Sequence, residues 1–108
     1  MTGAPKRKGD GAERELVVSL RSLGLEVARA YGAGRPDDVG DLDGLPGVYA
    51  QVKYYADPWR AVREALDAGD ERSEPWPTGF VRYPRRPLFV VCMRLEPWAD
   101  MYRAATGG

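Results

Sequence analysis

Two polar side chains lie two residues apart in the segment Val48–Tyr55, and a group of acids precedes them. Residues two apart in a strand point to the same face, so Gln51 and Lys53 share one face while Val52 faces the other way. The acids, which have no intervening base, are Asp37, Asp38, Asp41 and Asp43. Alone, these acids are typical of a solvated loop. Beside the strand, a carboxylate, an amide oxygen and an ammonium can surround one point, which suits a metal ion and a phosphate.

Glu13 is a further candidate, in a helical pattern upstream. At about 100° per residue, Glu13 falls within about 20° of Leu20 and about 40° of Val17, so its carboxylate points along the apolar face. A carboxylate facing a core is costly unless it is paired or bound to a cation. The spacing leaves two interpretations open: Glu13 is a functional carboxylate, or it forms a capping box with Asp10.

The composition limits the chemistry. The chain has 108 residues, which corresponds to one domain, and its 16 basic and 16 acidic residues cancel. The absence of histidine excludes histidine bases and His-ligated zinc, and the single Cys92 excludes an intrachain disulfide and a Cys-rich metal site. A metal would be held by oxygen, which favours Mg²⁺ with Mn²⁺ as a substitute, and we expect no organic cofactor.

The chain shows no sign of membrane contact. The longest apolar run, 87–93, is too short to span a bilayer, and residues 1–10 lack a signal-peptide core. We therefore expect a cytoplasmic protein. Residues 1–9 are predicted to form a flexible basic arm, and 10–108 a single domain.

The periodicity predicts the elements that position these residues. Asp10 is predicted to cap a helix that runs to about Leu23, and Asp57 a second helix that carries an apolar stripe and ends at Gly69. A last helix is predicted to open at Pro97. Strands are expected within 25–31, 39–43, 48–55, 79–83 and 88–95, the last two as a hairpin. The stripe of the second helix consists of Trp59, Val62 and Leu66.

The order α-β-β-β-α-β-β-α predicts a mixed α/β (α+β) fold with helices against a central sheet of about five strands. Glu13, the Gly40-Asp41-Leu42 segment and the Gln51-Val52-Lys53 segment resemble, in residue type and order, the P-D…(D/E)-x-K nuclease superfamily. Within it, KGDGAERELVVSLRSLGLEVARAYGAG, followed by GDLDG and QVK, is similar to the Holliday-junction resolvases of archaeal and phage type. The resemblance covers nearly the whole chain. It implies a restriction-endonuclease-like core and a Mg²⁺-dependent DNA endonuclease, a homodimer that resolves four-way junctions in branched DNA.

The resemblance also implies roles by position. Asp41 matches the family's metal-binding aspartate, and together with the Gln51 side chain and the Val52 backbone carbonyl it would hold Mg²⁺. Lys53 matches the catalytic lysine, and Glu13 the first-helix glutamate, which would orient a second metal, a metal-bound water or Lys53. The sequence departs from the family at Gln51, where the commonest members have Glu.

Asp38 competes with Asp41 for the metal role. We prefer Asp41, because Gly40-Asp41-Leu42-Asp43-Gly44 looks like the strand and turn of the phage branch.

Segregated basic residues are consistent with binding to branched or duplex DNA, since arginine and lysine suit phosphate contacts. The candidates are Lys6, Arg7, Lys8, Arg35, Arg82, Arg85 and Arg86. Arg85 and Arg86 can also be turn residues that protect a hairpin edge. The aromatic residues after Lys53 either stack on a splayed base or pack in the core or a dimer; they are Tyr54, Tyr55 and Trp59.

Other functions stay open from sequence. One is a different nuclease on the same fold, of nicking, mismatch or restriction type. Another is a degenerate DNA-binding or structural subunit in which Gln51 marks a lost metal site. A third is a scaffold protein unrelated to DNA, whose binding would be indifferent to salt.

Overall fold

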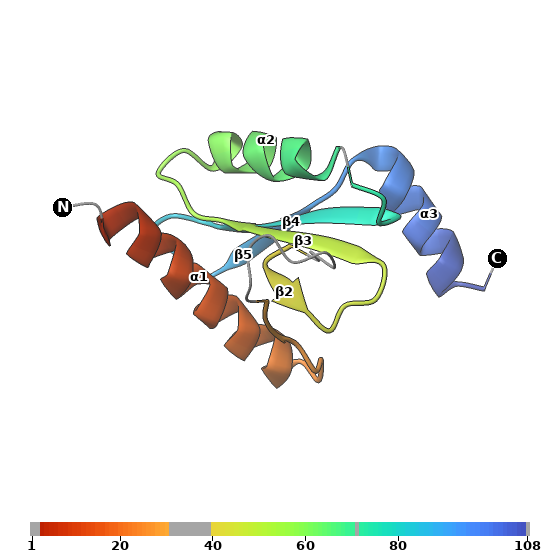
Figure 1. The fold of residues 1–108 in the computed structure, drawn as a ribbon, viewed down its shortest axis with the longest axis horizontal. Coiled ribbons are helices and arrows are strands. Elements are labelled where there is room, and N and C mark those ends of the chain that lie inside the picture. The colour runs from red at the N-terminus through yellow and green to blue at the C-terminus, as the bar shows by residue number, and fades with distance from the viewer. Residues whose placement is uncertain (1–2, 31–39, 71, 108) are drawn as a thin grey trace.

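The computed structural model describes residues 3–30, 40–70 and 72–107, with side chains from residue 11 onward. Within these residues, three helices and five strands follow one another in the predicted succession (Figure 1). They are α1 (Gly3–Ser22), β1 (Ala28–Arg29), β2 (Leu42–Asp43), β3 (Val48–Lys53), α2 (Pro58–Gly69), β4 (Trp76–Arg82), β5 (Phe89–Cys92) and α3 (Leu95–Ala105). The mixed α/β class is confirmed.

The described strands form two small sheets, so the expectation of one five-stranded central sheet is wrong. β4 lies at the centre of the larger sheet, parallel to β3 and antiparallel to β5, which confirms the predicted hairpin. β1 and β2 form an antiparallel pair, and a parallel bridge between Gly40 and Ala50 links them to β3. The sheets separate because the chain turns away after this bridge, where the Asp41 carbonyl accepts a hydrogen bond from the Ala30 amide (2.9 Å).

The larger sheet lies between α1 and α2 (Figure 1). On the α1 side, an apolar stripe of the helix meets alternate residues of β3, and the contact buries Leu16 and Val17 against Ala50 and Val52. The remaining buried members of this cluster are Ala12, Val27, Leu42 and Phe80. This core holds β3, with the predicted polar pair on its other face, firmly in place.

The bounds of α2 agree with the sequence prediction. Asp57 is the N-cap and accepts a hydrogen bond from the Trp59 amide (3.0 Å). Pro58 occupies the first turn, and the helix ends at Gly69. α3 begins at Leu95, two residues before the predicted start.

The buried face of α2 is not the predicted stripe. Gly79 of β4 lies so close to the helix that a Cβ there would come within 2.7 Å of the Ala65 Cβ. Such close packing admits only small side chains on the facing helix, so Ala61, Ala65 and Gly69 are buried. Trp59 is consequently turned outward and is 71% exposed.

α1 begins at Gly3, so the predicted start at Asp10 is wrong. Pro5 falls in the first turn, where its missing amide hydrogen costs no hydrogen bond, and the Lys and Arg residues that follow favour a helix. Residues 3–9 therefore belong to the helix. Asp10 lies inside α1 and is not its N-cap.

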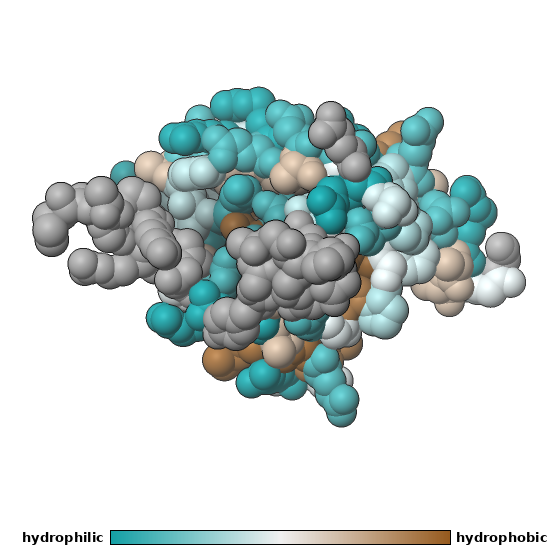
Figure 2. Space-filling model, in the orientation of Figure 1, coloured by the Kyte–Doolittle hydropathy of each residue, from teal (hydrophilic) through white to brown (hydrophobic). Residues whose placement is uncertain are grey.

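Exposed apolar side chains lie on α1, on α3, and at Trp59 and the β4–β5 hairpin. Figure 2 shows a largely hydrophilic face with hydrophobic residues along its lower edge. Val18 of α1 and Leu23, which follows the helix, are exposed. On α3, all of whose residues are described, no side chain is buried, and Leu95, Trp98 and Tyr102 are exposed. None of the described helices combines the length and apolar character needed to cross a bilayer.

Candidate active site

The structure brings together two segments that the sequence placed ten residues apart, Gly40-Asp41 and Gln51-Val52. The Asp41 amide donates to the Ala50 carbonyl (2.7 Å), which continues the parallel bridge at Gly40. The Asp41 Oδ2 atom then accepts a hydrogen bond from the Val52 amide (2.7 Å). The carboxylate thus contacts the peptide group that joins Gln51 to Val52, inside the predicted motif.

This contact has a structural cause. In a regular parallel ladder, the Val52 amide would donate to a backbone carbonyl of the neighbouring strand. The Asp41 carbonyl is turned toward β1 instead, where it accepts from the Ala30 amide, and the Asp41 carboxylate replaces it as acceptor for Val52. Gly40 allows this path, because it adopts φ 89° and a Cβ there would collide with the Ala50 carbonyl oxygen.

Gln51 and Lys53 lie on the α2 side of β3. The Gln51 Nε2 atom donates to the Tyr49 hydroxyl (3.3 Å), two residues away on the same face, whereas Ala50 and Val52 face the α1 core. The predicted division of the strand faces is confirmed for these residues. The amide oxygen of Gln51 carries the lone pairs that can bind a cation, whereas its amide nitrogen is a donor and binds Tyr49.

A hydrogen-bonded group on α2, absent from the sequence prediction, lies beside Lys53. Glu64 accepts hydrogen bonds from the Tyr55 hydroxyl (2.6 Å) and from Arg60 Nε (3.0 Å), and the Arg60 guanidinium lies 4.2 Å from the Tyr55 ring centre. The bond from Tyr55, reinforced by Arg60 and more weakly by the charge of Lys53, lowers the pKa of Glu64. The same carboxylate raises the pKa values of Tyr55 and Arg60. The i,i+4 spacing of Arg60 and Glu64 was the available signal in the sequence.

Glu13 is an ion-pair partner instead of a helix cap. Its Oε1 atom lies 3.0 Å from Arg29 Nη2 and 3.1 Å from Arg29 Nε, and the two side chains are only 19% and 16% exposed. The capping box is excluded because Asp10 lies within α1. Helical periodicity correctly predicted that Glu13 faces inward. The ion pair with Arg29 of β1 offsets the cost of burying the Glu13 charge.

We expect Glu13→Gln to lower the free energy of unfolding by about 1–3 kcal/mol, because it removes one negative charge from its contact with a largely buried guanidinium. If Glu13 also acts in catalysis, this variant loses cleavage by orders of magnitude, whereas Arg29→Gln, which breaks the same pair but keeps the carboxylate, retains more. Thermal melts measure the stability of both variants. Single-turnover assays, run below the melting temperatures, measure their cleavage rates. Equal, near-wild-type cleavage by both would leave Glu13 a purely structural residue.

The predicted DNA-binding residues divide into three groups. Arg82 is engaged internally: it contacts Glu15 (2.9 Å), lies 5.2 Å from the Tyr54 ring centre and donates to the Tyr83 carbonyl (2.6 Å) and to the Arg86 carbonyl. Arg85 and Arg86 are exposed in the β4–β5 turn, where Arg85 adopts φ 68°. Lys6, Arg7 and Lys8 lie in α1, but their side chains are outside the described part, and Arg35 lies outside it altogether. The same is true of Asp37 and Asp38 from the predicted acidic group.

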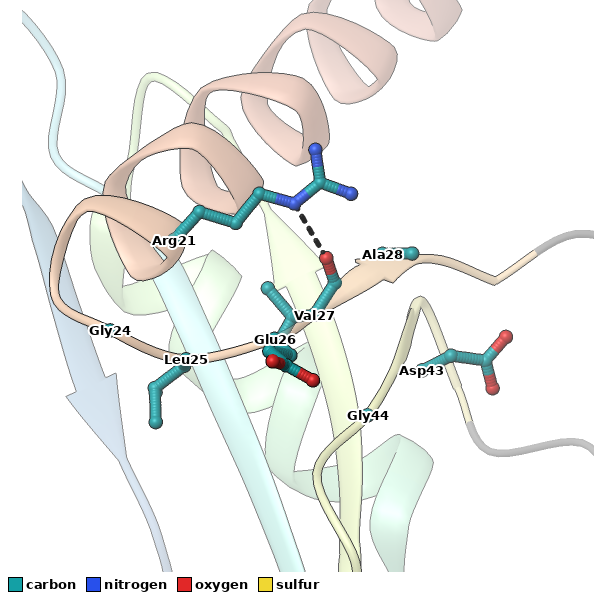
Figure 3. Close-up of a pocket in the computed structure, with 8 residues that line it drawn as sticks. All are labelled: Arg21, Gly24, Leu25, Glu26, Val27, Ala28, Asp43 and Gly44. Atoms are coloured by element: carbon teal, nitrogen blue, oxygen red, sulfur yellow. Dashed lines mark hydrogen bonds between the residues drawn. The ribbon is translucent and has the colours of Figure 1, made fainter.

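A hollow of about 490 Å³ at the end of α1 is separate from these residues. Figure 3 shows Arg21 donating to the Val27 carbonyl (2.8 Å) at one wall. The carboxylates of Glu26 and Asp43 come from different walls and do not converge on one point. The lining contains neither Asp41 nor Lys53, so we do not assign this hollow to the candidate active site.

No protein-family model matches this chain, and no curated protein matches it either. The resemblance to junction resolvases therefore depends on the motif residues themselves.

Proposed function

We propose that this protein is a metal-dependent DNA endonuclease. The observation that carries the proposal is the hydrogen bond from the Val52 amide to Asp41 Oδ2, because it joins the acidic segment to the strand that holds Gln51 and Lys53. A carboxylate, an amide oxygen and an ammonium near one strand edge suit phosphodiester hydrolysis. The mixed α/β fold supports a restriction-endonuclease-like core, which we include in the proposal.

The donor atoms fit Mg²⁺. In a strand, the N–H and C=O of one residue point to the same edge, so the Val52 carbonyl is directed to the edge where Asp41 accepts its amide. Asp41, the Gln51 amide oxygen and the Val52 carbonyl would form an all-oxygen set. The described residues contain no group of three acidic, Cys or His ligands, but Mg²⁺ commonly binds through one or two carboxylates and keeps several waters.

The residues divide the chemistry among them. When bound, Mg²⁺ or Mn²⁺ would lower the pKa of a water and neutralise charge on the phosphate. Lys53 would place its ammonium against the phosphate oxygens and stabilise the negative charge that develops there. The Val52 hydrogen bond orients Asp41, and Glu64 with its partners borders the Lys53 side. Glu13 remains a candidate second carboxylate of this site.

Within this class we propose a Holliday-junction resolvase that acts in the cytoplasm as a homodimer. A four-way junction has two-fold symmetry, and a two-fold dimer presents two matched sites to it. The exposed stripe on α3 supports a dimer: Leu95, Trp98 and Tyr102 are spaced at i, i+3 and i+7, so one helix face is apolar and uncovered in the single chain.

A gel assay tests the function. Purified protein is incubated with a four-way junction, a flap and a linear duplex of the same sequence, with Mg²⁺ and with EDTA. The proposal expects Mg²⁺-dependent cleavage, strongest on the junction. Cleavage of all substrates alike would indicate another nuclease of the same fold. Salt-sensitive binding without cleavage would indicate a degenerate DNA-binding subunit, and no binding would indicate a protein unrelated to DNA.

We expect Gln51→Glu to reduce the Mg²⁺ concentration needed for half-maximal cleavage, because a carboxylate adds a full negative charge at the cation. The hydroxyl of Tyr49 can donate to the new carboxylate, so the local contact is kept with its direction reversed. A Mg²⁺ titration of cleavage for both proteins measures the effect. An unchanged titration would show that the Gln51 side chain is not a ligand.

A further inference from the structure

The outward turn of Trp59 leaves an apolar pocket between α2 and the β4–β5 hairpin. The pocket has a volume of about 290 Å³ and is lined by Pro58, Trp59, Val62, Val81, Tyr83 and Val90. Trp59 is 71% exposed and Tyr83 41% exposed, so both rings are accessible in the single chain. Two accessible aromatic rings beside an apolar floor are a recognised arrangement for stacking a nucleobase.

The pocket adjoins the candidate active site. Val81, which is 1% exposed and forms the floor, is the register partner of Lys53 on the neighbouring strand. Paired residues of adjacent strands point to the same face and their strands lie about 4.8 Å apart. The Lys53 side chain and the pocket therefore open on the same face of the sheet, one strand apart.

The charge around the pocket suits a polyanion. Arg63 follows Val62 on α2, and Arg85 and Arg86 follow Tyr83 in the hairpin turn; all three are exposed. The nearby carboxylates are already engaged: Asp57 caps α2, and Glu64 binds Tyr55 and Arg60. A base in the pocket would thus have cations available for its flanking phosphates.

We propose that this pocket receives an unstacked base of the DNA substrate, next to the phosphate that Lys53 contacts. The inference rests on the proposed function and narrows its substrate to DNA in which a base near the cut is unpaired or easily unstacked. It also gives Trp59 a role in selecting that substrate.

Binding in EDTA, where cleavage is absent, tests this pocket. The probes are two duplexes that differ only in whether a 2-aminopurine is paired or bulged. We expect wild-type protein to prefer the bulged duplex and to quench its fluorescence by stacking. Trp59→Ala should weaken binding to the bulged duplex about 5- to 150-fold, the equivalent of about 1–3 kcal/mol for a stacked base, and leave the paired duplex unaffected. Trp59→Phe should recover most of the preference.

Leu23→Ala is the matched control, since Leu23 is 77% exposed and lies outside the pocket. The inference is overturned if Trp59→Ala and Leu23→Ala bind the bulged duplex equally well. It is also overturned if Trp59→Ala converts a dimer to a monomer in sedimentation, since a second copy of the chain would then fill the pocket. Wild-type cleavage of a junction separates the outcomes: if it persists, only the pocket assignment fails, and if it is absent, the proposed function fails.

Discussion

Lys53→Ala is expected to reduce DNA cleavage by about 100- to 1000-fold or more, because it removes the positive charge proposed to stabilise the phosphate in the transition state. Lys53 is the last residue of β3, and its side chain lies on the face opposite the Ala50 and Val52 core. We therefore expect its loss to change the free energy of unfolding by no more than about 0.5 kcal/mol. Single-turnover cleavage and a thermal melt on the same sample measure both quantities.

Arg103→Ala is the control for this variant, since it also removes one positive charge but lies on α3, away from the strand that carries Lys53. Its cleavage should equal that of the wild type. Junction binding in EDTA by Lys53→Ala should stay within a few-fold of wild type. Unimpaired cleavage by Lys53→Ala would show that Lys53 has no part in the mechanism. The resemblance would then lose its catalytic lysine.

Local signals were sufficient to predict several elements. The start of α2 follows from Asp57 and Pro58, which act through a hydrogen bond and a backbone angle within one turn, and the helix ends at the predicted Gly69. The faces of β3 follow from alternation, because the geometry of a strand leaves a side chain only two directions. The shared face of Gln51 and Lys53 was therefore predictable from their residue types and their spacing of two.

Features that depend on contacts between distant segments were not predictable. The partner of Glu13 is Arg29, 16 residues away, and periodicity shows only that Glu13 faces inward. Trp59 belongs to the apolar stripe of α2 by spacing, but Gly79 on β4 draws the small residues of the helix to the sheet and turns the tryptophan outward. Arg82 was predicted to bind DNA because of its positive charge. The sequence does not show that this charge contacts Glu15, 67 residues away.

The contact between Asp41 and Val52 has a part that the sequence predicts and a part that it does not. Residue types and order singled out Asp41, but the turn of its carbonyl toward β1, which frees the Val52 amide for the carboxylate, depends on the pairing of three strands. The same contact gives Asp41 a structural role beside the proposed metal role. A test of Asp41 must therefore separate charge from hydrogen bonding.

Asp41→Asn makes this separation. The asparagine amide oxygen can still accept the Val52 hydrogen bond, so we expect the fold to persist with a loss of about 0.5–1.5 kcal/mol in the free energy of unfolding, because a charge-assisted bond becomes a neutral one. The negative charge proposed to hold Mg²⁺ is lost. Cleavage should therefore fall by at least about 100-fold, and raising the Mg²⁺ or Mn²⁺ concentration should recover only part of it.

Asp38→Asn is the matched variant, and it should reduce cleavage by less than about tenfold, or ~1.4 kcal/mol in activation free energy. Single-turnover rates across a metal titration, with a thermal melt of each variant, compare the two aspartates directly. The reverse ranking would show that Asp38 is the metal ligand and that the contact of Asp41 with the Val52 amide is structural. Asp41→Ala, which removes both the charge and the acceptor, should be less stable than Asp41→Asn in either case, since the Val52 amide then loses its partner.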